Sequence, residues 1–197
     1  MAKVVKFPGP APEKFGLQRA RKRKGDLPGK AGQLNLFGGR VIKLNHLSTF
    51  EEALMLDEAG NYEQASVLYQ KAIGEGDFVA DAWCNLGIIE SQKENHARAI
   101  DAFTKCLVND PRHYEAHYNL ANLYAEVGNY ALAKVHYAIA SEIEPTFPNS
   151  YFNLGITLAM NREYTEAIRV LKKYCSLTPA EDHGPAIELI SQLSSLG

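Results

Sequence analysis

The chain has 197 residues, of which 46% are hydrophobic and 22% are charged, with a formal net charge of −2. This length accommodates one modest domain with an appendage and leaves no room for a second globular domain. No run of about 18 apolar residues is present, and Pro8, Gly9, Pro10 and Pro12 interrupt any signal-peptide core. We therefore expect a cytoplasmic protein without a membrane span.

The near-neutral total hides two oppositely charged parts. Residues 1–45 hold eleven Lys or Arg against two acidic residues, a net charge of +9, which leaves −11 for residues 46–197. The first part is rich in Pro and Gly and has little apolar periodicity, so it cannot bury enough surface to offset the entropy of ordering it. We expect residues 1–45 to be a disordered basic tail that the rest of the chain attracts.

A basic run in this tail has three interpretations. Its cations could gain affinity for nucleic acid by releasing phosphate counterions. The run could instead dock within the same chain in an acidic groove and inhibit binding until displaced, or it could remain solvated without fixed docking. The residues concerned are Arg19, Arg21, Lys22, Arg23 and Lys24.

A second segment of the tail, residues 33–37, reads Gln-Leu-Asn-Leu-Phe. It resembles the motif Q-L-[SD]-L-F, through which bacterial polymerases and repair proteins dock on the replication sliding clamp. The resemblance implies that the amide of Gln33 anchors one end and that Leu34, Leu36 and Phe37 provide the apolar contacts. Alternatively, these apolar side chains cover the first exposed face of the helical part that follows.

From residue 46 onward, a 34-residue period organises the chain. A small residue recurs as Ala65, Ala99, Ala133 and Ala167, and the bulky residue four positions later is Tyr69, Phe103, Tyr137 and Leu171. Another small position reads Ala53, Gly87, Ala121 and Gly155. Pro111, Pro145 and Pro179 close the last three periods, and each should end a helix, because proline lacks an amide donor and clashes with the preceding turn.

This pattern resembles the tetratricopeptide repeat family, whose repeat reads W-x2-L-G-x2-Y, then A-x3-F, then P. The first period departs from it by lacking the Leu and the Pro, and Glu90 replaces the aromatic residue of the second. The resemblance implies an all-α, right-handed superhelical solenoid of helix-turn-helix repeats, with turns rich in Gly and Asn. The expected boundaries are 46–79, 80–113, 114–147 and 148–181, followed by a capping helix at 182–197.

The expected capping helix begins near Gly184 and Pro185, which suits a first helical turn. Ile187, Ile190 and Leu193 follow at helical spacing and should form its apolar face. Such a helix would cover the last repeat with a polar outer surface.

The same resemblance implies that the first helices of the repeats line a concave groove that binds peptides. Its acidic positions are Glu51, Asp57, Glu58, Asp81, Glu115 and Glu126, without any Lys or Arg. Its apolar positions are Phe50, Ile88, Tyr118, Phe152, Ile156 and Met160. We therefore expect a basic peptide or protein as the partner.

Asparagine recurs in this groove as Asn85, Asn119 and Asn153, with Asn122 nearby. Because an amide side chain both donates and accepts hydrogen bonds, such a column could hold a peptide backbone. The alternative is that these residues serve helix packing or solvation.

The sequence contains no motif for catalysis or for a cofactor. His113 and His117 lie four apart, but a stable metal site usually needs further ligands, so we expect no metal. Cys84, Cys106 and Cys175 are expected to be buried or half-buried thiols. We predict a non-enzymatic scaffold for protein interaction; the alternative is a DNA replication or repair factor that docks on the sliding clamp. The sequence leaves the oligomeric state open.

Overall fold

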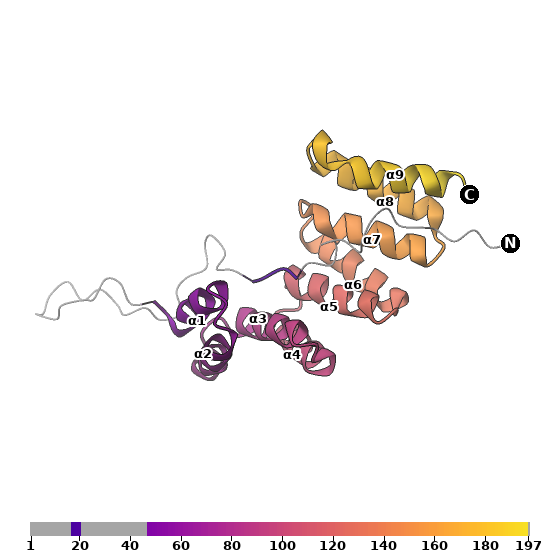
Figure 1. Ribbon diagram of the computed structural model, residues 1–197. Coiled ribbons are helices and arrows are strands. Elements are labelled where there is room, and N and C mark those ends of the chain that lie inside the picture. The colour runs from indigo at the N-terminus through magenta and orange to yellow at the C-terminus, as the bar shows by residue number, and fades with distance from the viewer. Residues whose placement is uncertain (1–16, 21–46, 197) are drawn as a thin grey trace, which may run out of the picture. The chain divides into compact units, whose positions relative to one another are not determined.

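The computed structural model of the chain describes residues 17–20 and 47–196 (Figure 1). The described residues form nine α-helices and no β-strand, which confirms the predicted all-α class. The helices are α1 (Thr49–Glu58), α2 (Tyr62–Glu75), α3 (Val79–Gln92), α4 (His96–Asn109), α5 (Tyr114–Glu126), α6 (Tyr130–Ile143), α7 (Pro148–Met160), α8 (Tyr164–Leu177) and α9 (Gly184–Ser194). None of these helices is long and apolar enough to cross a membrane.

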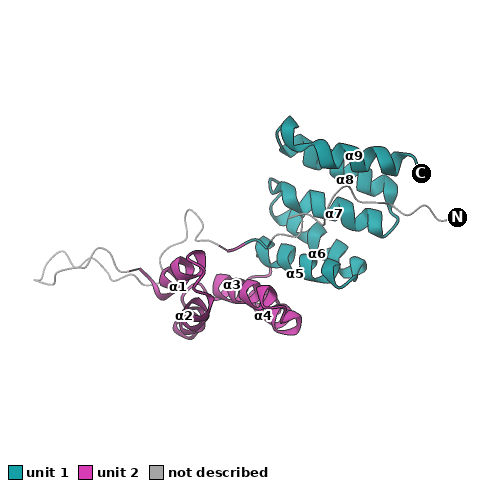
Figure 2. Ribbon diagram, in the orientation of Figure 1, with its two compact units in different colours: residues 1–18, 112–197 teal, residues 19–111 magenta. Residues whose placement is uncertain are grey.

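The chain divides into two compact units, which Figure 2 distinguishes by colour. Unit 2 comprises residues 19–111 and contains α1 to α4, each packed against the next. Unit 1 comprises residues 1–18 and 112–197 and contains α5 to α9, again packed in succession. Each unit is therefore a stack of helical hairpins in which a hairpin buries the apolar face of its neighbour.

The helices end where the sequence predicts. Helices α4, α6 and α8 stop two residues before Pro111, Pro145 and Pro179 respectively. Helix α2 has no such proline; it ends instead at Gly76, whose φ of 75° allows its N–H to bond back to the last helical turn. A left-handed glycine thus replaces the proline stop in the first repeat.

The turn inside each hairpin needs one residue with positive φ, and the 34-residue period places it. Gly60 and Gly128 have φ of 81° and 77°, and Glu94 and Arg162 occupy the equivalent positions with φ of 60° and 64°. A side chain in this region costs about 1–2 kcal/mol. The repeat therefore imposes the turn even where glycine is absent.

Two glycines allow the helices of their hairpins to approach closely. A Cβ added to Gly87 would lie 2.7 Å from the Phe103 ring, and one added to Gly155 would lie 2.6 Å from Cγ of Leu171. Phe103 and Leu171 are fully buried, so neither has room to retreat. The predicted pairing of a small and a bulky position is therefore a packing contact of these two hairpins.

Helix α9 packs against α8, as expected of a terminal helix, but one predicted contact is wrong. The buried residues of α9 are Ala186, Leu189 and Leu193, and Ile190 is partly buried. Ile187 was expected on this face and is 57% exposed. The reason is the helical pitch: Ala186 and Leu189 align with Leu193, whereas Ile187 is rotated about 100° from Ala186.

Candidate functional site

In unit 2, the side chain of Asn85 on α3 binds the backbone of a tail residue, Ala20. The N–H of Ala20 donates to Oδ1 of Asn85 at 2.9 Å, and Nδ2 of Asn85 donates to the carbonyl oxygen of Ala20 at 3.1 Å. Both residues are completely buried. One amide side chain thus satisfies both backbone groups of one residue without contacting its side chain through a hydrogen bond.

The preceding tail residue, Arg19, binds a buried carboxylate at the end of α1. Its Nε donates to Oδ2 of Asp57 at 2.9 Å and its Nη2 donates to Oδ1 at 2.7 Å. Asp57 is 1% exposed, and the guanidinium carbon lies 5.9 Å from the centre of the Tyr62 ring. Burial lowers the pKa of Arg19, but the hydrogen bond and the charge of Asp57 outweigh it, so the pKa is raised overall. Such fork-to-fork geometry is the strong form of an ion pair.

Tyr69 on α2 connects these two contacts. Its hydroxyl donates to Oδ2 of Asp57 at 3.1 Å and accepts from Nδ2 of Asn85 at 3.0 Å. Burial and the Asp57 charge raise the pKa of this hydroxyl well above its ordinary value, so the hydroxyl keeps its proton. We call Asp57, Tyr62, Tyr69 and Asn85 the unit 2 site. Because Tyr69 orients both polar side chains, the site is preorganised for its occupant.

Unit 1 contains an equivalent backbone contact on α5. The N–H of Gln18 donates to Oδ1 of Asn119 at 2.7 Å, and Nδ2 of Asn119 donates to the carbonyl oxygen of Gln18 at 2.7 Å. Asn119 stands 34 residues after Asn85, and the residues that they bind are two apart. Each unit therefore binds both backbone polar groups of one tail residue through a single asparagine side chain.

A third asparagine at the same repeat position, Asn153 on α7, lies in unit 1 with Asn119. Its Nδ2 donates to the hydroxyl of Tyr118 at 3.0 Å and to Oδ1 of Asn122 at 3.2 Å, and Asn122 also accepts from the hydroxyl of Tyr137. Burial raises the pKa of Tyr118 to about 12, although both asparagines lower it. Oδ1 of Asn153 is buried and has no hydrogen-bond partner in the described part of the chain.

The predicted acidic residues of the groove have different surroundings. Glu51 accepts a hydrogen bond from the N–H of Ser48 and so caps α1, and Glu115 is 4% exposed with its Oε2 3.2 Å from Nδ1 of His113. Asp81 is partly exposed, and Glu58 and Glu126 are exposed. Asp57, which is 1% exposed, binds the described tail residue Arg19.

The predicted apolar positions are mostly closed to solvent. Ile88, Tyr118 and Ile156 are buried, and Phe152 is partly exposed with its ring 4.9 Å from that of Tyr174. Their contact with a foreign peptide stays a prediction.

His113 and His117, which lie four residues apart in the sequence, contact different groups. Nδ1 of His113 caps α5 by accepting from the N–H of Ala116, whereas Nδ1 of His117 lies 2.9 Å from Nδ1 of His136 on α6. Burial and then the His117 charge lower the pKa of His136 to about 4. This imidazole is therefore neutral at neutral pH. Its pairing with His117 could not be predicted from the sequence, because the two residues lie on different helices.

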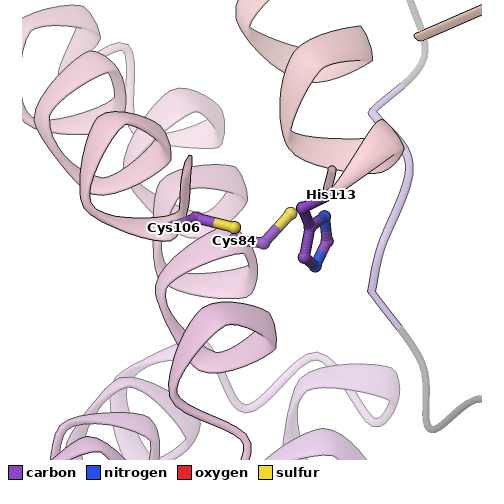
Figure 3. A group of neighbouring side chains, drawn as sticks. All are labelled: Cys84, Cys106 and His113. Atoms are coloured by element: carbon purple, nitrogen blue, oxygen red, sulfur yellow. The ribbon is translucent and has the colours of Figure 1, made fainter. Parts of the chain in front are cut away.

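Two thiols of unit 2 lie close together in one hairpin. Cys84 on α3 and Cys106 on α4 are buried, and their Sγ atoms lie within 4.8 Å of one another (Figure 3). His113, which Figure 3 also labels, belongs to unit 1. Cys175 is half-buried, and burial raises its pKa. These positions agree with the predicted structural thiols.

Several predicted residues lie outside the described part of the chain. They are the basic residues Arg21, Lys22, Arg23 and Lys24 and the clamp-motif residues Gln33, Leu34, Leu36 and Phe37. Of the nucleic-acid candidates, Arg19 is described, and its charge is paired with Asp57.

Comparison with known proteins identifies the repeats. Models of the tetratricopeptide repeat match residues 80–113, 102–135 and 136–169. Among curated proteins, the peroxisomal targeting signal receptor of Saccharomyces cerevisiae is 31% identical over 75 residues, which cover 38% of this chain and 12% of the receptor. The chain thus matches only about an eighth of that relative's length.

Solved structures show the same fold at low sequence identity. A mutant of MamA superposes with a TM-score of 0.63 and 23% identity, covering 75% of this chain and 85% of that one. The first tetratricopeptide domain of Spaghetti (RPAP3), bound to the HSP90 peptide SRMEEVD, superposes with a TM-score of 0.55 and 19% identity, covering 59% of this chain and 91% of that one.

Proposed function

The chain carries tetratricopeptide repeats, and from this premise we propose that it is a non-enzymatic module that binds an extended, basic peptide segment of a partner protein. The observation that carries the proposal is the pair of identical backbone contacts that Asn85 and Asn119 make with Ala20 and Gln18. One relative is named as a receptor for a targeting signal, and one structural neighbour is bound to a peptide.

The chemistry of the contacts defines the ligand class. Because each asparagine binds both the N–H and the carbonyl of one residue, the ligand must expose both of these backbone groups to the asparagine of a unit. In unit 2, the buried carboxylate of Asp57 favours a cation on the residue that precedes the one bound by Asn85.

Catalysis has no support in the arrangement of these groups. The buried tyrosines hold their protons, because burial raises their pKa, and their hydroxyls bond to asparagine or aspartate side chains. A reaction needs assignable roles of nucleophile, base and electrophile, and the groups of these sites are committed to binding a backbone.

Backbone recognition can be tested with N-methylated peptides. We would release the tail by the double substitution Arg19→Glu/Ala20→Trp in the full chain and measure, by fluorescence anisotropy, binding of a peptide of residues 13–24. N-methylation at the residue corresponding to Gln18 or Ala20 should weaken binding about tenfold, because each methyl removes a hydrogen-bond donor. The matched control is N-methylation at the residue corresponding to Arg19, which should change the affinity little, because its N–H has no acceptor among residues 17–20 and 47–196.

The result would contradict the proposal if all three methylated peptides bound like the parent peptide. Retained folding of the released chain is checked by its melting temperature, so a failure to bind cannot be mistaken for unfolding.

The alternative function, a replication or repair factor that docks on the sliding clamp, depends on residues 33–37 and on a basic tail that contacts nucleic acid. It stays a prediction from the sequence. The pairing of Arg19 with Asp57 removes one cation from the nucleic-acid candidates, whereas peptide binding draws on that same contact.

A further inference from the structure

We infer that the unit 2 site selects an arginine followed by a small residue, and that the chain's own Arg19-Ala20 is an intramolecular competitor for that site. The inference rests on the proposed function and deepens it by naming the side chains that the partner must present. The asparagine contacts involve only the backbone and do not distinguish one side chain of a ligand from another. Any selectivity for the ligand's side chains therefore has to come from Asp57 and from the space around Ala20.

The requirement for arginine follows from how Asp57 is held. Its carboxylate is 1% exposed, and the hydroxyl of Tyr69 fixes one oxygen, so both oxygens present a planar pair of acceptors. The guanidinium of Arg19 fills that pair with two donors at 2.7 and 2.9 Å. A lysine ammonium is a compact, more strongly hydrated charge and cannot form the two parallel bonds. An acidic or apolar residue would leave the buried carboxylate without its cation.

The requirement for a small residue follows from the position of Ala20. Its backbone is fixed at both polar groups by Asn85, and the residue is completely buried. The Cβ therefore cannot shift along or away from α3 without breaking these bonds. A branched or longer side chain would have to displace packed protein atoms, which typically costs more than its added apolar contact returns.

The tail competes with any partner because it is covalently attached to its own site. A tethered ligand acts at an effective concentration that reaches the millimolar range for short flexible linkers. A partner therefore has to carry the same chemistry and bind well enough to displace Arg19 and Ala20. The basic segment of this chain is, on this account, the template for the partner's recognition sequence.

The test compares side-chain variants of the peptide of residues 13–24 on the tail-released chain, Arg19→Glu/Ala20→Trp. A peptide with Arg19→Lys and one with Ala20→Leu should each bind at least about tenfold more weakly than the parent peptide. A scrambled peptide of identical composition is the control for net charge. The parent chain, with its tail intact, should bind the parent peptide at least about tenfold more weakly than the released chain.

Asp57→Asn in the released chain gives a readout that a merely structural role would not change. The carboxamide can no longer accept two charged donors, so the preference for the Arg peptide over the Lys peptide should fall below about threefold. The comparison of the two peptides on the released chain stands on its own should the Asp57→Asn chain be unstable.

The possible results distinguish a failure of the inferred selectivity from a failure of the proposed function. If the parent, Arg19→Lys and Ala20→Leu peptides bind within about threefold of each other, the inferred selectivity is wrong, while the N-methylation result decides the proposed function separately. If the parent and released chains bind the parent peptide equally, the competition is wrong. If the folded released chain binds no peptide, the proposed function fails together with this inference.

Discussion

Replacing Gly155 or Gly87 by alanine is expected to lower the free energy of unfolding by about 1–3 kcal/mol each. The new methyl of Gly155→Ala would lie 2.6 Å from Cγ and 2.7 Å from Cδ2 of Leu171. That of Gly87→Ala would lie 2.7–2.9 Å from three atoms of the Phe103 ring. Alanine is the better helix former by about 1 kcal/mol, so a net loss of stability would show that packing outweighs propensity. The change in the free energy of unfolding is measured by urea unfolding monitored by circular dichroism.

Gly74→Ala is the matched control for these two variants. Gly74 is also in a helix, α2, but a Cβ there meets nothing within 4 Å. This variant should be neutral or more stable by up to about 1 kcal/mol. Equal effects of the three substitutions would contradict the close approach of helices at Gly87 and Gly155.

The second large effect concerns Arg19, which we expect to stabilise unit 2 from outside the repeats. Arg19→Ala should lower the free energy of unfolding by about 2–4 kcal/mol, because it leaves a buried carboxylate without its cation. In the Arg19→Ala background, Asp57→Asn should recover part of this loss, since it removes the uncompensated charge. A double-mutant cycle measured by urea unfolding gives the coupling energy between the two side chains.

Arg169 provides the comparison on the protein surface. It forms the same kind of ion pair, with Glu166 one turn away, but the two side chains are 72% and 46% exposed, against 25% and 0% for Arg19 and Asp57. Arg169→Ala should therefore cost at most about 1 kcal/mol. Arg19→Ala and Arg169→Ala having the same small effect would mean that the tail does not occupy the unit 2 site.

Much of the fold follows from the period of 34 residues. Many repeat positions are used in the same way, so the small residue at Gly87 predicts the one at Gly155, and the stops before Pro111 and Pro145 predict the one before Pro179. Even Glu94 and Arg162 adopt the backbone that Gly60 and Gly128 adopt. Periodic packing is a local, repeated constraint, and a sequence pattern records such constraints directly.

The candidate site was only partly predictable, because some of its contacts do not repeat along the chain. The asparagine column was visible as Asn85, Asn119 and Asn153, because it repeats. The pairing of Arg19 with Asp57 joins residues 38 apart, one of which lies outside the repeats, and it occurs once. The sequence allowed docking of the basic run in an acidic groove among other possibilities, but it could not name the residue that would be buried.

The net charges of the tail and of the repeats predicted that the two attract each other, but not which residues make contact. Opposite charges on the tail and the repeats favour many loose encounters equally. What distinguishes one of them is geometry: Arg19 meets a carboxylate that Tyr69 has oriented, and Ala20 meets an amide that the same hydroxyl orients. Such preorganisation comes from packing between helices and has no signature in composition.

Amide hydrogen exchange of the tail tests the central claim most directly, namely that in each unit an asparagine side chain binds the backbone of one tail residue. In the intact chain, the N–H groups of Gln18 and Ala20 should exchange roughly a hundredfold more slowly than in the free peptide of residues 13–24, with Arg19 less protected than both. Asn85→Ala should remove the protection of Ala20. Exchange of all three amides at the rate of the free peptide would contradict the account.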